Sequence, residues 1–480
     1  MNIQDLEPRI VFKFFREILT IPRPSKKEGK IIKYLLDFAE KYNLKAKTDK
    51  AGNVLISKDA TASCKNLPTI VLQSHVDMVC EKNNDVVFDF DNDAIQAYVD
   101  GNWVKAKGTT LGADCGIGIA AQLAILASND IEHGNLECLF TVDEETGLTG
   151  AFELEPDFFT GKILLNLDSE DEGEIFIGCA GGRDTLGKIA YAEVNAPEKE
   201  IALRIDVKGL KGGHSGDDIN KGLACANKIL NRLLYPFFDD IEINKFDGGN
   251  LRNAIAREAY AIITISPDKA VEFKKHAVKF EEEVRYEYRS TEPDMKIIVT
   301  ETEKPATVID SKAKFSLMNC LYACPHGVLA MSREIPNLVE TSTNLASVKM
   351  DGKYINIATS QRSAVNTSKD DACACVAACF KLVGAEVLHG DGYPGWIPNP
   401  DSSILAVAEN VYEKTFDKKP LVKAIHAGLE CGLFLEKYPD LDMISFGPTL
   451  RGVHSPDERL DIASVQKFWL LLINILKELK

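Results

Sequence analysis

The sequence lacks an excess of positive charge, and it lacks any apolar run long enough to cross a bilayer. Its 480 residues hold 56 Lys and Arg against 72 Asp and Glu, a net charge of −16. Nucleic acids and anionic membrane surfaces reward basic patches, so we expect neither as a partner. The longest apolar runs, such as Phe468–Ile473, are far shorter than the roughly 20 residues of a spanning helix. No basic segment followed by an apolar stretch opens the chain, so we expect no signal peptide and a cytoplasmic protein.

No disulfide framework is recognisable either. The 12 cysteines are scattered through apolar segments, which favours a reducing compartment. The densest group, Cys373, Cys375 and Cys379, lies in an Ala-rich stretch, where helical spacing would not bring the three thiols to one ligand face. We interpret this group as core packing, with a metal site as the alternative. The 45% hydrophobic and 27% charged content is typical of a globular protein, and the length predicts two or three domains.

Strand-like and helical segments alternate up to about residue 186, which predicts an α/β domain with a mixed, largely parallel sheet. Strands are expected at 53–57, 69–76, 137–142, 163–167 and 174–177, and helices at 8–20, 26–43 and 115–128. Ser25 and Glu28 form a candidate capping box for the second helix. The middle of the chain has the character of an inserted α+β region with two similar-sized halves. We therefore predict a catalytic domain, residues 1–186 and 387–480, interrupted by a double-length lid domain, residues 187–386.

A His-x-Asp motif ends one of the predicted strands. Residues i and i+2 of a strand point the same way, so Asp77 could hold the second ring nitrogen of a metal-binding His75. On its own, a structural His–Asp pair is the commoner interpretation. Asp114 lies among small residues at the start of a predicted apolar helix. It could cap that helix, or it could be a metal ligand, because a segment with little side-chain bulk can approach a metal closely.

Acidic residues and a second histidine follow other strands and turns. Asp143, Glu144 and Glu145 are adjacent carboxylates that repel one another, which a solvated turn tolerates and a bound cation relieves. If Glu145 binds a metal, Glu144 could be the general base. Asp168 ends a further strand, and His454 follows a Gly/Pro turn. Strand ends of one α/β domain commonly build its site, and two His with three acids and no thiolate suit zinc, manganese or cobalt.

Five motifs, in this order, resemble the two-zinc metallopeptidase family that includes aminoacylases, glutamate carboxypeptidases and dipeptidases. They are Ser-His-x-Asp (74–77), Leu-Gly-Ala-Asp-x-Gly (111–116), Asp-Glu-Glu-Thr-Gly (143–147), Leu-Asp-Ser-Glu (167–170) and Val-His-Ser-Pro (453–456). Longer phrases resemble the branch that hydrolyses aminoacyl-histidine dipeptides; they lie at 166–173, 211–216, 336–345 and 425–432. The resemblance covers essentially the whole chain. It implies the two-domain zinc-peptidase fold and hydrolysis of Xaa-His dipeptides, including β-alanyl-histidine, by a metal-bridging hydroxide. An N-acyl amino acid deacylase on the same scaffold is the alternative.

The resemblance also implies how two Zn²⁺ per chain are held, with Co²⁺ or Mn²⁺ as substitutes. One zinc takes His75 and Asp168, the other takes Glu145 and His454, and Asp114 bridges them. In the same scheme Asp77 orients His75, and Glu144 is the general base.

The lid residues implied by the resemblance are His214, Asn253 and Arg362. His214 fits as a donor to the oxyanion, and Arg362 as a partner of the substrate's α-carboxylate. Ala256 stands where relatives have proline, a departure beside Asn253. Glu430 could meet a free α-amino group or form a buried salt bridge. The expected partner is a small dipeptide, and the protein is expected to be a monomer or a homodimer, with His214 acting in its own chain or in the partner's.

Overall fold

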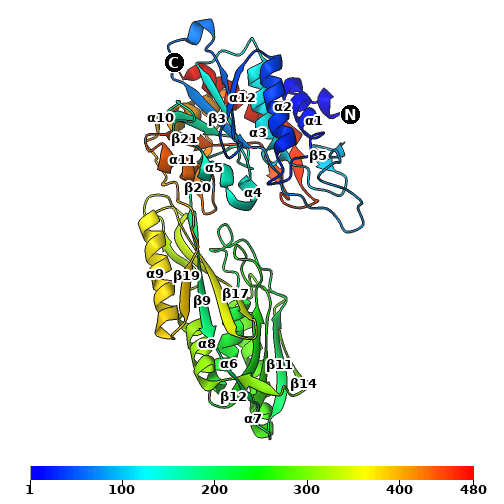
Figure 1. Cartoon of the computed structure of the whole chain (residues 1–480), viewed down its shortest axis with the longest axis vertical. Helices are drawn as coiled ribbons and strands as arrows, with labels where there is room; N and C mark the ends of the chain where they lie inside the picture. Colours follow the sequence, from blue (N-terminus) through cyan, green and yellow to red (C-terminus); the bar gives the residue numbers. More distant parts are fainter. Residues whose placement is uncertain (1, 480) are drawn as a thin grey trace. The chain divides into compact units, whose positions relative to one another are not determined.

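The computed structural model describes residues 2–479, which form two compact units (Figure 1). Unit 1 comprises the residues up to Gly178, Trp396–Ala424 and the residues from Leu429 onward, and unit 2 comprises Cys179–Gly395 and Ile425–Gly428. The predicted boundary at 186 falls inside a strand, β9 (Gly181–Ala190), so the division comes before that strand. Among residues 2–479, no helix combines the length and the apolar character that a bilayer crossing requires.

Unit 1 is an α/β unit. Its elements are a 3-10 helix (Ile3–Asp5), α1 (Arg9–Ile18), α2 (Gly29–Lys41), β1 (Lys45–Thr48), β2 (Val54–Lys58), a 3-10 helix (Ala62–Cys64), β3 (Ile70–His75), β4 (Ala97–Asp100), β5 (Trp103–Ala106), α3 (Ala113–Ala127), β6 (Leu136–Thr141), α4 (Glu144–Gly147), α5 (Thr149–Glu153), β7 (Ile163–Asn166), β8 (Glu174–Cys179), α10 (Ser403–Phe416), β20 (Leu421–Ile425), α11 (Cys431–Lys437), β21 (Asp442–Ser445), β22 (Leu450–Arg451), β23 (Arg459–Asp461) and α12 (Ile462–Glu478).

The main sheet of unit 1 is mixed, with a parallel centre. Its strand order is β1-β2-β6-β3-β7-β21-β8-β20, and β6, β3, β7 and β21 pair in parallel. The predicted fold class, a mixed and largely parallel α/β sheet, is confirmed. A separate four-stranded sheet, β22-β23-β5-β4, was not expected. β1 and β4 lie at the edges of these two sheets. They bury too little apolar surface to show a clear strand pattern in the sequence, and all four residues of β1 are exposed.

The central strands of unit 1 are covered on both faces. All six residues of β3 and all six of β6 are buried, and α3 packs against β3 and α1. Buried parallel strands of this kind read as continuous apolar runs and are therefore easy to locate in a sequence. The capping box predicted at Ser25 and Glu28 is wrong, because Glu28 itself precedes α2 without capping it and the Ser25 hydroxyl donates elsewhere, to Asp77.

Unit 2 is antiparallel. Its elements are β9, β10 (Glu193–Asn195), β11 (Ile201–Lys208), α6 (Ala226–Leu234), a 3-10 helix (Tyr235–Phe237), β12 (Ile241–Gly248), β13 (Ala259–Ile265), α7 (Pro267–Glu287), β14 (Lys296–Thr302), β15 (Thr307–Ile309), α8 (Ser311–Ala323), β16 (Gly327–Met331), β17 (Val339–Met350), β18 (Tyr354–Ser363), α9 (Asn366–Leu382) and β19 (Glu386–His389).

The two expected halves of unit 2 share one nine-stranded sheet. Its order is β14-β11-β13-β12-β17-β18-β9-β19, with β16 also paired to β17. The halves join where β12 meets β17, through the single register pair Gly248 and Val348. On α9, Cys373 is buried but Cys375 is exposed, so core packing describes the first thiol and is wrong for the second.

Candidate metal centre

Three neighbouring parallel strands end at one edge of the main sheet, and the candidate ligands follow them. β3 ends on His75, which lies opposite Thr141, the last residue of β6. Asp168 comes two residues after the end of β7. Because parallel strands share their carboxyl-terminal edge, the residues that follow them are brought together. Two further segments reach the same edge. Residues 111–114, which lead into the non-helical start of α3 and are called the Asp114 loop, carry Asp114, and a turn carries His454.

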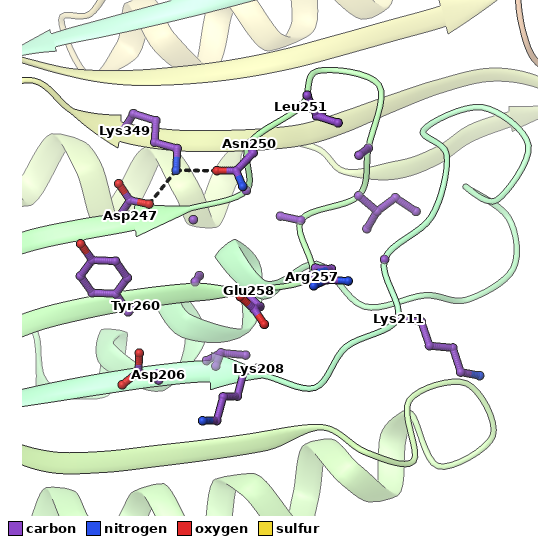
Figure 2. A pocket seen from close by; sticks show the side chains of 18 of the residues that line it. Asp206, Lys208, Lys211, Asp247, Asn250, Leu251, Arg257, Glu258, Tyr260 and Lys349 are labelled. Atoms are coloured by element: carbon purple, nitrogen blue, oxygen red, sulfur yellow. Dashed lines mark hydrogen bonds and ion pairs between the residues drawn. The ribbon is translucent and has the colours of Figure 1, made fainter. Parts of the chain in front are cut away.

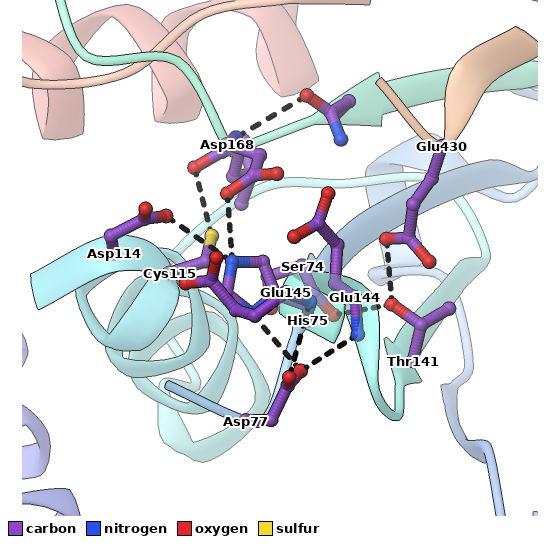
Figure 3. A network of polar contacts seen from close by, with 12 residues as sticks. Ser74, His75, Asp77, Asp114, Cys115, Thr141, Glu144, Glu145, Asp168 and Glu430 are labelled. Carbon is purple, nitrogen blue, oxygen red and sulfur yellow. Dashed lines mark hydrogen bonds and ion pairs between the residues drawn. The ribbon is translucent and has the colours of Figure 1, made fainter. Parts of the chain in front are cut away.

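All five predicted ligands lie in one cluster of unit 1 (Figure 3 labels four of them). His75 Nε2 lies 3.2 Å from Asp114 Oδ1 and 3.3 Å from Asp168 Oδ1. His454 Nε2 lies 3.4 Å from Asp114 Oδ2 and 3.0 Å from Glu145 Oε2. Each oxygen of Asp114 therefore faces a different imidazole. One further carboxylate stands beside each ring, Asp168 beside His75 and Glu145 beside His454.

The cluster has the chemistry of a site for divalent cations. Donor atoms of His75, Asp114 and Glu145 all lie within 4.8 Å of one another. Glu145 Oε1 is buried and makes no hydrogen bond to any described residue. Hydrogen bonds to Asp114 and Glu145 raise the pKa of His454 to about 11. Crowded carboxylates with an unused buried oxygen need positive charge, and a pair of divalent cations supplies it, so the residues fit the metals that the sequence implied.

Asp77 holds both His75 and the acidic turn. Its Oδ1 lies 3.3 Å from His75 Nδ1, and the carboxylate accepts the Ser25 hydroxyl at 2.7 Å. It also accepts the backbone N–H groups of Glu144 and Glu145, at 3.0 and 3.2 Å. Although burial opposes it, hydrogen bonding from His75 and these groups lowers the pKa of Asp77 to about 2. An ionised Asp77 fixes the tautomer of His75 with Nε2 toward the cluster.

Glu144 lies beside the ligands without contacting an imidazole. In Figure 3 its side chain projects into the same region as Asp168 and Glu430. Loss of water around the carboxyl raises the pKa of Glu144 well above its ordinary value, and repulsion from Asp168 and Glu145 adds to the effect. Hydrogen bonds fix the turn around Glu144. Asp143 has a left-handed backbone conformation, with φ 50°, and its carboxylate accepts hydrogen bonds from the hydroxyls of Thr146 and Thr149.

Two buried residues that the sequence patterns did not single out position the Asp114 loop. The carboxylate of Glu458 accepts the backbone N–H groups of Leu111, Gly112 and Ala113 at 2.7, 2.9 and 2.8 Å. The Arg23 guanidinium donates to the carbonyl oxygens of Asp77 and Gly112 and so ties two ligand-bearing segments together. A glutamate four residues after His454 was a usable signal for Glu458. Nothing in the local sequence marked Arg23.

Glu458→Gln is expected to weaken metal binding without removing a ligand. An amide offers only one acceptor oxygen, so the N–H groups around the Asp114 loop lose part of their common partner and the loop is held less firmly. Groups that position ligands typically contribute 10- to 100-fold in metal affinity, so we expect a loss of about that size. Competition with a chelating dye measures it. Arg459→Gln, at the neighbouring half-buried side chain that contacts none of the ligands, is the control and is expected to keep the affinity of the parent protein.

Glu430 lies in the same network and is fully buried. Its Oε2 accepts Gln73 Nε2 at 2.6 Å and the Thr141 hydroxyl at 2.8 Å, while Oε1 has no hydrogen-bond partner among the described residues. Burial raises the pKa of Glu430 to about 8. No cationic side chain of residues 2–479 forms an ion pair with it, so the salt-bridge alternative is not what the structure shows.

The other predicted residues lie in unit 2, where they share one neighbourhood. His214 and Ala254 form an isolated β-bridge, and the Ser215 N–H donates to the Asn253 carbonyl at 2.8 Å. His214 Nδ1 accepts the backbone N–H groups of Gly216 and Asp217, at 3.3 and 3.2 Å. In the neutral ring the proton is then on Nε2, which leaves this nitrogen as a donor.

Arg362 is a buried cation of unit 2 with neutral partners. It is 7% exposed; its Nε donates to the Ser215 hydroxyl at 3.3 Å and its Nη1 to the Tyr393 hydroxyl at 2.9 Å. No carboxylate within the described residues forms an ion pair with it. Buried charges are normally paired, so this guanidinium is suited to an anion from outside the chain. Asn253, by contrast, is exposed.

A separate pocket of unit 2, of about 560 Å³, contains none of the predicted site residues (Figure 2). Its charged side chains have both signs. Lys208, Arg257 and Glu258 are exposed, and Lys349 is already held by Asp247 at 2.7 Å. Exposed and paired charges do not define a ligand, so this pocket is not a candidate site.

Comparison with known proteins links both units to peptidases. The model of peptidase family M20/M25/M40 matches residues 71–478. The cytosol non-specific dipeptidase of Escherichia coli K12 is 40% identical over 480 residues, which are 100% of this chain and 99% of that protein. The crystal structure of an aminoacylhistidine dipeptidase from Vibrio alginolyticus superposes with a TM-score of 0.89 at 41% identity and covers 99% of this chain and 98% of its own. An aminopeptidase PepT from Bacillus cereus, at 16% identity, coverage of 99% of both chains and a TM-score of 0.58, shares the fold.

Proposed function

The chain belongs to peptidase family M20/M25/M40, and we propose that it is a cytoplasmic dipeptidase that uses two zinc ions to hydrolyse short peptides with free termini. Its substrates include Xaa-His dipeptides such as β-alanyl-histidine. The observation that carries the proposal is Asp114, whose two oxygens face the His75 and His454 rings at 3.2 and 3.4 Å, with Glu144 beside them. The two dipeptidases that match over the full chain support the substrate class, and the deacylase alternative is not favoured.

The ligands divide into two sets around Asp114. His75 and Asp168 would hold one ion, Glu145 and His454 the other, and Asp114 would contact both. When bound, such a pair lowers the pKa of water and polarises the scissile carbonyl. Asp77 keeps the His75 ring oriented, and Glu458 keeps the Asp114 loop in place.

Glu144 moves the proton. It has no imidazole partner among the described residues and lies next to Glu145, so its carboxylate is free to accept a proton from the attacking water and to deliver it to the leaving amine. Co²⁺ and Mn²⁺ accept the same donors and are expected to substitute for zinc.

Unit 2 supplies recognition. We assign the substrate's α-carboxylate to Arg362, whose buried charge has no acidic partner in the described part of the chain, and the oxyanion to His214, whose Nε2 can donate because Nδ1 accepts two backbone N–H groups. Asn253, which the family resemblance implies, is assigned to substrate binding as well. We assign the free α-amino group to Glu430, whose Oε1 has no partner in the described part of the chain.

Hydrolysis of a small panel tests the function. The panel contains β-alanyl-histidine, two other Xaa-His dipeptides, one dipeptide without histidine and one N-acetyl amino acid. We expect the free dipeptides to be cleaved, cleavage to stop in a chelator and to return with zinc, and the acetylated compound to resist. Cleavage of the acetylated compound alone, or no cleavage of any dipeptide with zinc present, would contradict the proposal.

Arg362→Met is expected to raise KM for free dipeptides about 10²-fold, because a desolvated charge-assisted pair is lost while the neighbouring apolar volume is kept. A dipeptide with an amidated C-terminus is the matched probe: it should be a poor substrate of the parent protein and be affected little by the substitution. An equal loss with both substrates would contradict the assignment of Arg362 to the carboxylate. Arg333→Met, at an exposed arginine of unit 2, serves as the control variant.

A further inference from the structure

The thiol of Cys115 is a potential donor atom in the cluster that the proposed zinc ligands do not use. We propose that Cys115 gives the His75–Asp168 side of the centre a second way to bind metal, in which sulfur coordinates thiophilic ions such as Cd²⁺. This inference rests on the ligand set proposed above. It assigns Cys115 no part in hydrolysis.

The geometry places the sulfur beside two ligands. Cys115 Sγ, a nitrogen of His75 and a carboxylate oxygen of Asp168 all lie within 4.8 Å of one another. Ligands of a tetrahedral site with bonds of about 2.0–2.3 Å stand roughly 3.6 Å apart, so the three donors need to close by no more than about 1 Å. Figure 3 shows the sulfur next to the Asp168 side chain. The second observation is Asp168 Oδ1, which is buried, lies 3.3 Å from His75 Nε2 and so already faces the same point as the sulfur.

The packing reserves space for this thiol. A Cβ at Gly118, one turn further along α3, would lie 2.7 Å from Cys115 Sγ and 3.0 Å from the Leu167 carbonyl oxygen. Any larger residue at Gly118 would push the thiol away. Cys115 is 2% exposed, and its thiol donates to the Leu167 carbonyl at 3.3 Å, immediately before Asp168 in the chain. The sulfur is therefore shielded from solvent and faces the ligand strand.

Hard and soft ions would use the cluster differently. Mn²⁺ prefers oxygen ligands and leaves the thiol protonated, whereas a soft ion prefers thiolate. On binding Cd²⁺ the S–H bond breaks, a Cd–S bond forms and the proton passes to the buffer; no electron is transferred. The thiol gives up its hydrogen bond to the Leu167 carbonyl in exchange for the metal bond.

The test is ¹¹³Cd NMR of the full chain, stripped by chelator and loaded with two equivalents of ¹¹³Cd²⁺. Thiolate ligation moves a ¹¹³Cd resonance far downfield of sites with nitrogen and oxygen ligands only. We expect one such downfield resonance in the parent protein, its loss in Cys115→Ser with both ions retained, and its persistence in Cys138→Ser. Cys138 is the matched control, a buried thiol in β6 outside the cluster. Co²⁺-loaded protein gives an independent readout, a near-ultraviolet sulfur-to-metal band that Cys115→Ala should abolish while the circular dichroism stays unchanged.

Each other result overturns the inference in a recognisable way. Two resonances of nitrogen and oxygen sites in the parent protein would leave the zinc-ligand proposal standing and exclude sulfur. A downfield resonance that survives Cys115→Ser would belong to another thiol. Failure of His75→Ala to change either resonance would overturn the ligand set itself, and with it the proposed function.

Discussion

Glu144→Gln is expected to lower kcat by about 10²–10⁴-fold while the protein keeps two zinc ions per chain. The amide has nearly the volume of the carboxyl group but cannot accept the proton of water. No imidazole among residues 2–479 contacts Glu144, whereas the neighbouring Glu145 lies 3.0 Å from His454, so loss of the carboxylate at 144 should not disturb the ligands. Steady-state kinetics with β-alanyl-histidine, together with zinc analysis of the same sample, gives both quantities.

The neighbouring residue provides the matched control. Glu145→Gln removes the same charge one position later, but from a ligand, so activity and about one zinc ion should be lost together. Unchanged kcat in Glu144→Gln would exclude Glu144 as the base. Loss of zinc from Glu144→Gln would show that it acts as a ligand, and the roles of the two glutamates would have to be exchanged.

The parallel strands at the centre of unit 1 could be predicted because buried strands stand out in the sequence as apolar runs. β3, β6 and β7 were expected within one or two residues of their actual ends, since strands covered on both faces are continuous apolar runs. His75, Glu145 and Asp168 followed from the same signal, as polar residues at or just after the ends of those runs, whereas Asp114 and His454 were found at a helix start and after a Gly/Pro turn. Their pairing across Asp114 came from the family resemblance, because spacing in the sequence carries no distance between separate loops.

What the sequence did not reveal is the support behind the ligands. Ser25 was interpreted as a helix cap from its spacing to Glu28, yet its hydroxyl holds Asp77, a contact over 52 positions. Arg23 connects the Asp77 and Gly112 carbonyls, and an arginine bound to backbone oxygens has no sequence signature. The same limit applies to unit 2, where a single register pair, Gly248 with Val348, joins two halves that look independent in the sequence.

Asp114→Asn is expected to reduce bound zinc more than any other single ligand substitution. Asp114 is the only carboxylate of the five proposed ligands with an oxygen toward each imidazole, at 3.2 and 3.4 Å. The amide loses the charge and keeps one neutral oxygen, so one ion loses its ligand atom and the other keeps only a weaker, uncharged one. Asp168→Asn and Glu145→Gln remove one contact each and should retain about one ion.

We do not expect Asp114→Asn to lose zinc through unfolding, because the loop around Asp114 is fixed by hydrogen bonds from its backbone N–H groups. Glu458 accepts the N–H groups of Leu111, Gly112 and Ala113, none of which the substitution touches. Zinc analysis after dialysis, with circular dichroism on the same samples, should therefore order the variants as parent, then Asp168→Asn and Glu145→Gln together, then Asp114→Asn. Retention of one full ion by Asp114→Asn would mean that Asp114 serves a single metal, and the bridging role would fail even if the peptidase activity of the parent protein stands.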